Sequence, residues 1–161
     1  MITFETIVGS VVGFLVVLGL GNSVKKIVNS CTKDLEINVP TGLSESVWKD
    51  YTANISAEGG KMIGFFERTL AFVSIWTGLV AVLGGWLAFK LASKWQVWSS
   101  IIKLPDEIEG VQPLEYAVAR RKWGSKVFTR FVVGTIANIL AGFTGVIVGH
   151  LVQAGLAYYC S

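Results

Sequence analysis

The chain has 161 residues and a formal net charge of +3, and 52% of its residues are hydrophobic while only 16% are charged. Soluble domains carry about 25% charged residues, and the deficit here falls in three long runs that are almost free of charge. This composition excludes a disordered chain, a disulfide-stapled mini-protein and an ordinary soluble enzyme domain, and it predicts a small membrane protein with several helices.

The first apolar run covers 6–24 and lies between Glu5 and the pair Lys25 and Lys26. As a helix it would be about 28 Å long, which matches a hydrocarbon core of about 30 Å. The alternative is a cleaved signal peptide. The residues before the run include no Lys or Arg, and the run is longer than the usual apolar region of such a peptide. We therefore expect a retained helix over about 6–26.

The second and third runs predict two longer helices. The second is uncharged over 69–89 and lacks a helix breaker on its C-terminal side, so we expect one helix over 62–98. The third is uncharged from 131 onward, and only 131–151 is needed to span. Because Pro113 suits the first turn of a helix and nothing later breaks the pattern, the third helix is expected over 114–158.

The loops predict further short helices. Leu43, Val47 and Tyr51 recur every four residues, which indicates a helix near 44–55 lying along the membrane interface. The predicted fold class is therefore all-α. We expect a polytopic membrane protein of one domain, 1–161, with three transmembrane helices and short interfacial helices in the loops.

The positive charges predict an orientation. The loop 25–61 carries five Lys residues, and the loop 90–130 carries eight Lys or Arg residues. The positive-inside rule then places the N-terminus and the loop 90–130 in the cytoplasm, and the loop 25–61 and the C-terminus outside. In this topology Cys31 and Cys160 both lie just beyond the outer face, in an oxidising compartment, where they either form a disulfide or stay as two thiols.

Four polar residues lie in or beside the apolar runs: Glu67, Arg68, Asn138 and His150. Ionisable residues inside a membrane are functional by default, so these side chains either face a lumen or make polar contacts between helices. Glu67 and Arg68 have a plainer interpretation as a boundary pair at the outer interface. Asn138 is more typical of helix packing, and His150 lies where the third helix leaves the membrane.

Small residues recur at spacings of four on two of the predicted helices, and basic residues gather beside the membrane. The small-xxx-small pattern lets helix backbones approach closely, so it predicts helix packing. It comprises Gly9 and Gly13 on the first helix and Ala137, Ala141, Gly145 and Gly149 on the third. Basic side chains near a bilayer attract anionic lipid. Those expected to do so are Lys90, Lys94, Arg120, Arg121, Lys122 and Lys126.

Sequence motifs of catalysis are missing. The chain has no Gly-rich phosphate loop, no G-x-S-x-G and no H-E-x-x-H, and its single histidine is too few for a structural metal site. We therefore predict a protein that is not an enzyme, with no cofactor, no bound metal and no nucleic-acid partner.

Four segments resemble a group of small, uncharacterised bacterial inner-membrane proteins. They are 63–68 (IGFFER), 85–95 (GWLAFKLASKW), 120–124 (RRKWG) and 134–138 (GTIAN). The resemblance covers about half of the chain. It implies a bacterial inner-membrane location, draws attention to Glu67, Arg68, Lys90 and Asn138, and implies no activity.

Two functional hypotheses follow. Three helices offer little protein for a solute pathway within one chain, so function is expected to require assembly. The leading hypothesis is a non-enzymatic membrane protein that acts as a homo-oligomer or as a subunit of a larger membrane assembly, in contact with membrane lipid. The alternative is a homo-oligomeric ion channel or pore with Glu67, Arg68 and Asn138 facing the lumen.

Overall fold

The computed structural model describes residues 3–33, 38–53, 57–99 and 108–160, with only the backbone described at 51–53, 57–59, 94–99 and 160. Within these residues every regular element is an α-helix. The helices are α1 (Phe4–Gly19), α2 (Gly21–Lys33), α3 (Glu45–Ala53), α4 (Ala57–Trp76), α5 (Val80–Ser99) and α6 (Pro113–Cys160).

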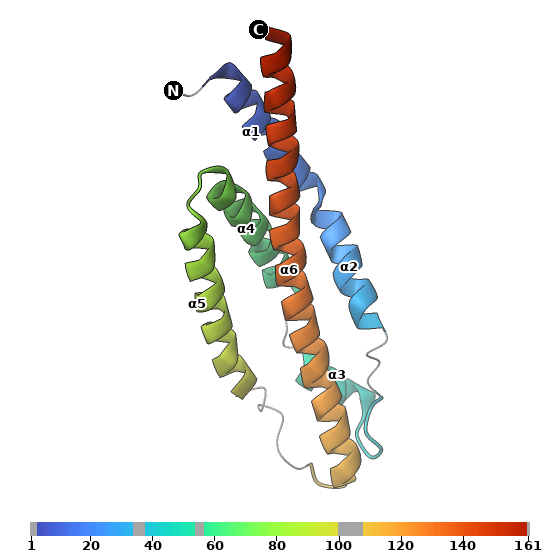
Figure 1. Cartoon of the computed structure of the whole chain (residues 1–161). Helices are drawn as coiled ribbons and strands as arrows, with labels where there is room; N and C mark the ends of the chain where they lie inside the picture. The colour runs from blue at the N-terminus through green and yellow to red at the C-terminus, as the bar shows by residue number, and fades with distance from the viewer. Residues whose placement is uncertain (1–2, 34–37, 54–56, 100–107, 161) are drawn as a thin grey trace.

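The long helix α6 runs through the whole molecule, and α1, α2 and α4 pack along it, while α5 packs beside α4 (Figure 1). It begins at Pro113 and ends at Cys160, close to the predicted range 114–158. Helices α1 and α2 form one nearly continuous helix with a bend at Leu20, where the backbone hydrogen bonds from Leu20 to Val16 and from Val24 to Leu20 continue the helical pattern. This composite helix lies antiparallel to α6, because Gly9 faces Gly149 and Val28 approaches Gly134.

Two helices are long and apolar enough to cross a membrane: the composite helix Phe4–Lys33 and the segment Pro113–Tyr159 of α6. Their large apolar side chains mostly point outward. Ile7, Val11 and Leu15 on α1 are each more than half exposed, as are Ile136 and Leu140 on α6. An apolar surface of this extent is unusual on a soluble protein and typical of a lipid-facing one.

The second apolar run forms two helices, not the single helix predicted over 62–98. Helix α4 ends at Trp76, the chain turns at Thr77–Leu79, and α5 returns beside α4 (Figure 1). Gly78 has a φ of +75°, a left-handed conformation that glycine adopts at little cost. The residue patterns on both sides of Gly78 are apolar and helical, so hydropathy alone does not reveal the turn.

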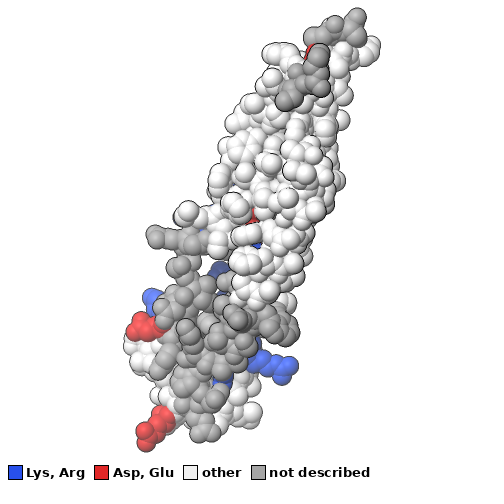
Figure 2. All heavy atoms as spheres, turned by 90° about the vertical axis from the view of Figure 1, so that its left-hand side faces the viewer, with Lys and Arg blue, Asp and Glu red and all other residues white. Residues whose placement is uncertain are grey.

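This turn changes the predicted topology. With α4 and α5 folded into a hairpin, the N-terminus and the C-terminus lie at the same end of the bundle (Figure 1). The expected placement of the termini on opposite sides of a membrane rested on three crossings, whereas two helices of this fold are long and apolar enough to cross one. Charged side chains gather at the other end, and the surface toward the termini is almost entirely uncharged (Figure 2).

At the charged end, α3 packs against the first turns of α6. Trp48 of α3, at 6% exposure, meets Tyr116 of α6 edge to face, with ring centroids 6.5 Å apart. Val111 and Ala119 complete this small core. Helix α3 was expected to lie along the membrane interface. Its Trp48 is buried against α6, whereas Val47 of the predicted apolar face is exposed.

Candidate functional site

A cluster of five polar side chains joins α4, α5 and α6, and we refer to it as the polar cluster. Lys90 of α5 forms an ion pair with Glu67 of α4, and its Nζ also donates to Oγ1 of Thr135 on α6 at 2.6 Å. Asn138 Nδ2 donates to the second carboxylate oxygen of Glu67 at 3.0 Å. Arg68 Nη1 donates to Asn138 Oδ1 at 2.8 Å. The chain of contacts therefore runs from Thr135 through Lys90, Glu67 and Asn138 to Arg68.

Most of the polar cluster is buried. Glu67 and Asn138 are 3% and 4% exposed, and the Lys90 side chain is 11% exposed. Burying a charge away from water is costly unless it is paired and hydrogen-bonded. Here both carboxylate oxygens of Glu67 have donors from the same chain, and the ammonium of Lys90 has two acceptors and also lies 4.7 Å from the centre of the Phe131 ring.

The position of Lys90 corrects one prediction. Lys90 was expected to reach outward to lipid phosphates, but its ammonium points into the bundle and neutralises Glu67. Glu67, interpreted as one half of a boundary pair, has its carboxylate buried between helices. The Lys90–Glu67 pair joins the two halves of the hairpin to each other, and the Lys90–Thr135 bond joins α5 to α6.

Arg68 occupies the edge of the polar cluster. It is half-buried, and its guanidinium lies so close to Gly21 that a Cβ there would be 2.9 Å from Nη2. Its buried Nε has no hydrogen-bond partner among the described residues. With Glu67 and Lys90 neutralising each other, the surplus positive charge of the cluster lies on Arg68.

The turn at Gly78 explains why these residues meet. Glu67 precedes Gly78 by about the same number of residues as Lys90 follows it, so a hairpin folded at Gly78 places the two charges opposite each other. Thr135, which was not among the predicted residues, lies one turn before Asn138 on α6 and shares its face. In the sequence, the nearly equal spacing of Glu67 and Lys90 from Gly78 is the feature that indicates this arrangement.

His150 lies apart from the polar cluster. Its ring stacks on Trp76 at the end of α4, with centroids 4.5 Å apart, and its Nδ1 is 3.4 Å from Oε1 of Gln153. Trp76 is next to the turn of the hairpin, so the tip reaches the level of His150 on α6. Asn138 and His150 are separated by about 18 Å along the helix, and the structure does not bring them into one site.

The predicted packing residues lie at helix contacts. A Cβ on Gly13 would be 2.5 Å from the Gly145 carbonyl oxygen, and one on Gly9 would be 2.6 Å from that of Gly149. Ala137 and Ala141 are buried against Val24 of α2. Gly142, which was not predicted, lies at a close contact between α6 and α4. A Cβ on Gly142 would be 2.7 Å from the Cβ of Ala71.

Of the two alternatives for Cys31 and Cys160, the structure has no disulfide at Cys31. Cys31 is an exposed free cysteine near the end of α2. Its neighbours Thr32 and Lys33 share a cleft with Arg130 of α6, and Cys160 lies about 45 Å further along α6. A disulfide requires Cα atoms within about 7 Å. The side chain of Cys160 lies outside the described residues.

The remaining basic residues lie at the charged end of the bundle. Arg121 and Lys122 are exposed, Arg120 and Lys126 are half-buried, and the Lys94 side chain lies outside the described residues. Lys126 and Arg130 line an open cleft of about 620 Å³ between α2 and α6, together with Asn29, Ser30, Thr32 and Lys33.

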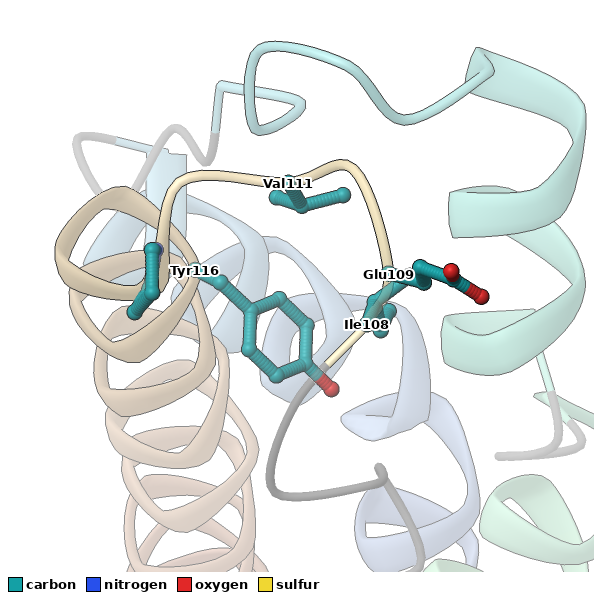
Figure 3. A pocket seen from close by; sticks show the side chains of 5 residues that line it. Ile108, Glu109, Val111 and Tyr116 are labelled. Atoms are coloured by element: carbon teal, nitrogen blue, oxygen red, sulfur yellow. The ribbon is translucent and has the colours of Figure 1, made fainter.

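A second cavity of about 250 Å³ lies under the loop that leads into α6 (Figure 3). It is lined mainly by Ile108, Val111, Pro113 and Tyr116, and the carboxylate of Glu109 points away from the Tyr116 ring (Figure 3). Among the described residues no group of three or more His, Cys, Asp or Glu side chains could hold a metal ion.

No known protein family, curated protein or solved structure matches the chain.

Proposed function

We propose that this chain is a non-enzymatic integral membrane protein that acts as a homo-oligomer or as a subunit of a larger membrane assembly. In this proposal the composite helix α1–α2 and helix α6 cross the membrane. The hairpin α4–α5 enters from the charged end and returns to the same end. The resemblance noted above suggests the inner membrane of a bacterium as the location.

The register of the helices supports this placement. The uncharged run 6–24 lies beside about 138–153 of α6, because Gln153 donates to Thr6 at one end of the run and Val24 packs on Ala137 and Ala141 at the other. Lys25 and Lys26 follow the run at the level of the polar cluster. The hairpin tip is at the level of His150. The tip therefore extends about 18 Å beyond the polar cluster, less than the hydrocarbon thickness of about 30 Å.

The positive-inside rule is easier to satisfy with two crossings than with three, because the basic residues then need not be divided between the two sides of the membrane. In the part of the chain that the structure describes, the five Lys residues of 25–61 and seven of the eight basic residues of 90–130 lie between the level of the polar cluster and the charged end. This end is proposed to be cytoplasmic, with both termini outside. Cys31 then lies on the reducing side, which agrees with a free thiol.

The observation that carries the proposed assembly is the exposed face of α5. Ala81, Gly85, Ala88 and Ala92 share one face of this helix, and all four are exposed. A Cβ on Gly84 or Gly85 would meet nothing within 4 Å. Glycine in a helix costs about 1 kcal/mol relative to alanine, and in membranes small residues are typical of faces against which another helix packs.

The polar cluster favours this proposal over the pore. A pore would need Glu67 and Asn138 to face a lumen, yet both are buried and bonded to partners of the same chain. Conductance recordings on the purified protein in bilayers test the alternative. A conductance whose ion selectivity changes in Arg68→Gln would favour the pore.

Native mass spectrometry of the gently solubilised full chain tests the assembly. We expect a mass larger than one chain, either a homo-oligomer or a complex with other chains, that falls to the monomer in Gly85→Leu. The matched control is Gly60→Leu, because Gly60 is also exposed on its helix with nothing near its Cβ position. A wild-type monomer, or a Gly85→Leu variant that keeps the larger mass, would contradict the proposal.

Labelling with a membrane-impermeant maleimide tests the topology. In a background without native cysteines, Thr3→Cys and Tyr158→Cys should react from one side of sealed vesicles. A single cysteine at position 31 should react only from the other side. A topology of three crossings predicts that Thr3→Cys and Tyr158→Cys react from opposite sides.

A further inference from the structure

We infer that the cleft between α2 and α6 binds the phosphate group of an anionic ligand, with an anionic phospholipid headgroup as the principal source. The cleft is lined by Asn29, Ser30, Thr32, Lys33, Lys126 and Arg130. The phosphate site is inferred from the cleft alone. The choice of a lipid as the source of the phosphate rests on the proposed membrane placement.

The chemistry of the lining favours a phosphate. Three of the six lining residues are cationic, and the other three carry an amide or a hydroxyl group. No acidic residue lines the cleft, and within the described residues Lys33, Lys126 and Arg130 form no ion pair. Arginine matches the geometry of phosphate oxygens with two parallel hydrogen bonds, and lysine contributes as a point charge. The volume of about 620 Å³ is within the range of small-ligand sites.

The location of the cleft favours a lipid as the source. Arg130 is the last charged residue before the uncharged run of α6 that begins at Phe131. A phosphate beside Arg130 would therefore hold its acyl chains next to the apolar surface of the bundle. Basic pockets between helices at the cytoplasmic face are known binding places for anionic headgroups.

The cleft differs from the basic residues of α6 that lie alone on the surface. Arg121 and Lys122 do not line the cleft, whereas the exposed Arg130 and the half-buried Lys126 share it with Lys33 of α2. Arg121 and Lys122 attract an anionic membrane without selecting one molecule, because a surface potential needs no shaped site. The cleft instead brings charges from two helices to one place, so it is expected to retain a single lipid after detergent extraction.

The test uses native mass spectrometry of the full chain in a nonionic detergent with added phosphatidylglycerol or phosphatidylcholine. We expect one phosphatidylglycerol molecule to be retained and phosphatidylcholine to bind more weakly. The double variant Lys126→Gln/Arg130→Gln should weaken phosphatidylglycerol binding about fivefold per charge. The matched control, Arg121→Gln/Lys122→Gln, removes the same charge from the same helix and should leave binding unchanged.

Two further variants test whether a loss of binding in the double variant comes from misfolding. Lys126→Arg keeps the charge and should keep the binding, whereas Ser30→Glu adds a negative charge from the other helix and should abolish it. Equal weakening in the cleft variant and in the control variant would overturn the inference, as would retention of phosphatidylglycerol by Ser30→Glu.

Inorganic phosphate distinguishes the two sources of the ligand. If phosphate alone binds at millimolar concentration and is lost in Lys126→Gln/Arg130→Gln, while phosphatidylglycerol does not bind, the phosphate site stands with a soluble source. If neither binds, the inference is wrong. These measurements in detergent require no oligomer and no crossing topology, so their failure is distinguishable from a failure of the proposed function.

Discussion

The α1–α6 interface and the outer face of α5 carry the same kinds of small residue in opposite surroundings. Gly9, Gly13, Gly145 and Gly149 each lie against the backbone of the facing helix, where an added Cβ would collide with a carbonyl oxygen. Gly84 and Gly85 meet nothing. The comparison shows that small-residue spacing marks a surface suited to helix packing, and that only the tertiary structure reveals whether this chain itself supplies the partner.

The α1–α6 contact and the α4–α5 hairpin are also held together differently. The α1–α6 contact is apolar along nearly its whole length, with Val17, Phe72 and Val146 in its core. The hairpin is held by the Glu67–Lys90 pair and by the Phe66–Trp86 ring contact, whose centroids are 5.1 Å apart. Four variants test these contacts, and the first is expected to cost the most stability.

Lys90→Met should have the largest effect on stability. It leaves the buried Glu67 carboxylate without its counter-ion, and removing one partner of a buried ion pair costs about 3–5 kcal/mol. Unfolding in detergent, followed by circular dichroism, measures the loss. Lys61→Met on the exposed surface of α4 is the control and should be nearly neutral. The double variant Glu67→Gln/Lys90→Met should recover part of the loss, and no recovery would contradict an ion-pair role.

Gly145→Val should destabilise the α1–α6 contact by about 3 kcal/mol through overpacking. The new side chain would collide with Val17 and with the carbonyl oxygen of Gly13. The same unfolding assay measures this loss. Gly155→Val provides the control, because Gly155 lies on the same helix with nothing near its Cβ position. Equal effects at the two positions would indicate a general cost of valine in α6 and not a packing contact.

Gly78→Ala tests the turn of the hairpin. A left-handed conformation costs a residue with a Cβ about 1–2 kcal/mol, and Gly78 has a φ of +75°. The expected result is a modest fall in the unfolding midpoint. Gly19→Ala is the comparison, because Gly19 has no positive φ and open space around it, so that substitution should not lower the midpoint. A Gly78→Ala protein as stable as wild type would argue that α4 and α5 can form one continuous helix.

Gly85→Ala should have the smallest effect and the opposite sign. Alanine is a better helix former than glycine by about 1 kcal/mol, and the site is open. The isolated chain should therefore become slightly more stable. If a partner helix packs on this face, the same variant should weaken the assembly seen by native mass spectrometry. A gain in both quantities would show that no helix packs closely at Gly85.

Much of the fold follows from the sequence. The uncharged run 6–24 and the uninterrupted pattern after Pro113 predict the two long apolar helices, because apolar length and the absence of breakers are local properties. Contacts at Gly9, Gly13, Gly145 and Gly149 also follow from local spacing. The polar residues Glu67, Arg68 and Asn138 stand out in an apolar background and are therefore easy to select.

The pairing of these elements was decided by tertiary structure. One glycine, Gly78, divides an apolar run that is long enough to span the membrane. The hairpin folded at this glycine brings Glu67 and Lys90 together beside Thr135. Hydropathy along the chain cannot distinguish a single spanning helix from a hairpin of two. The contacts that separate these alternatives join residues far apart in the sequence.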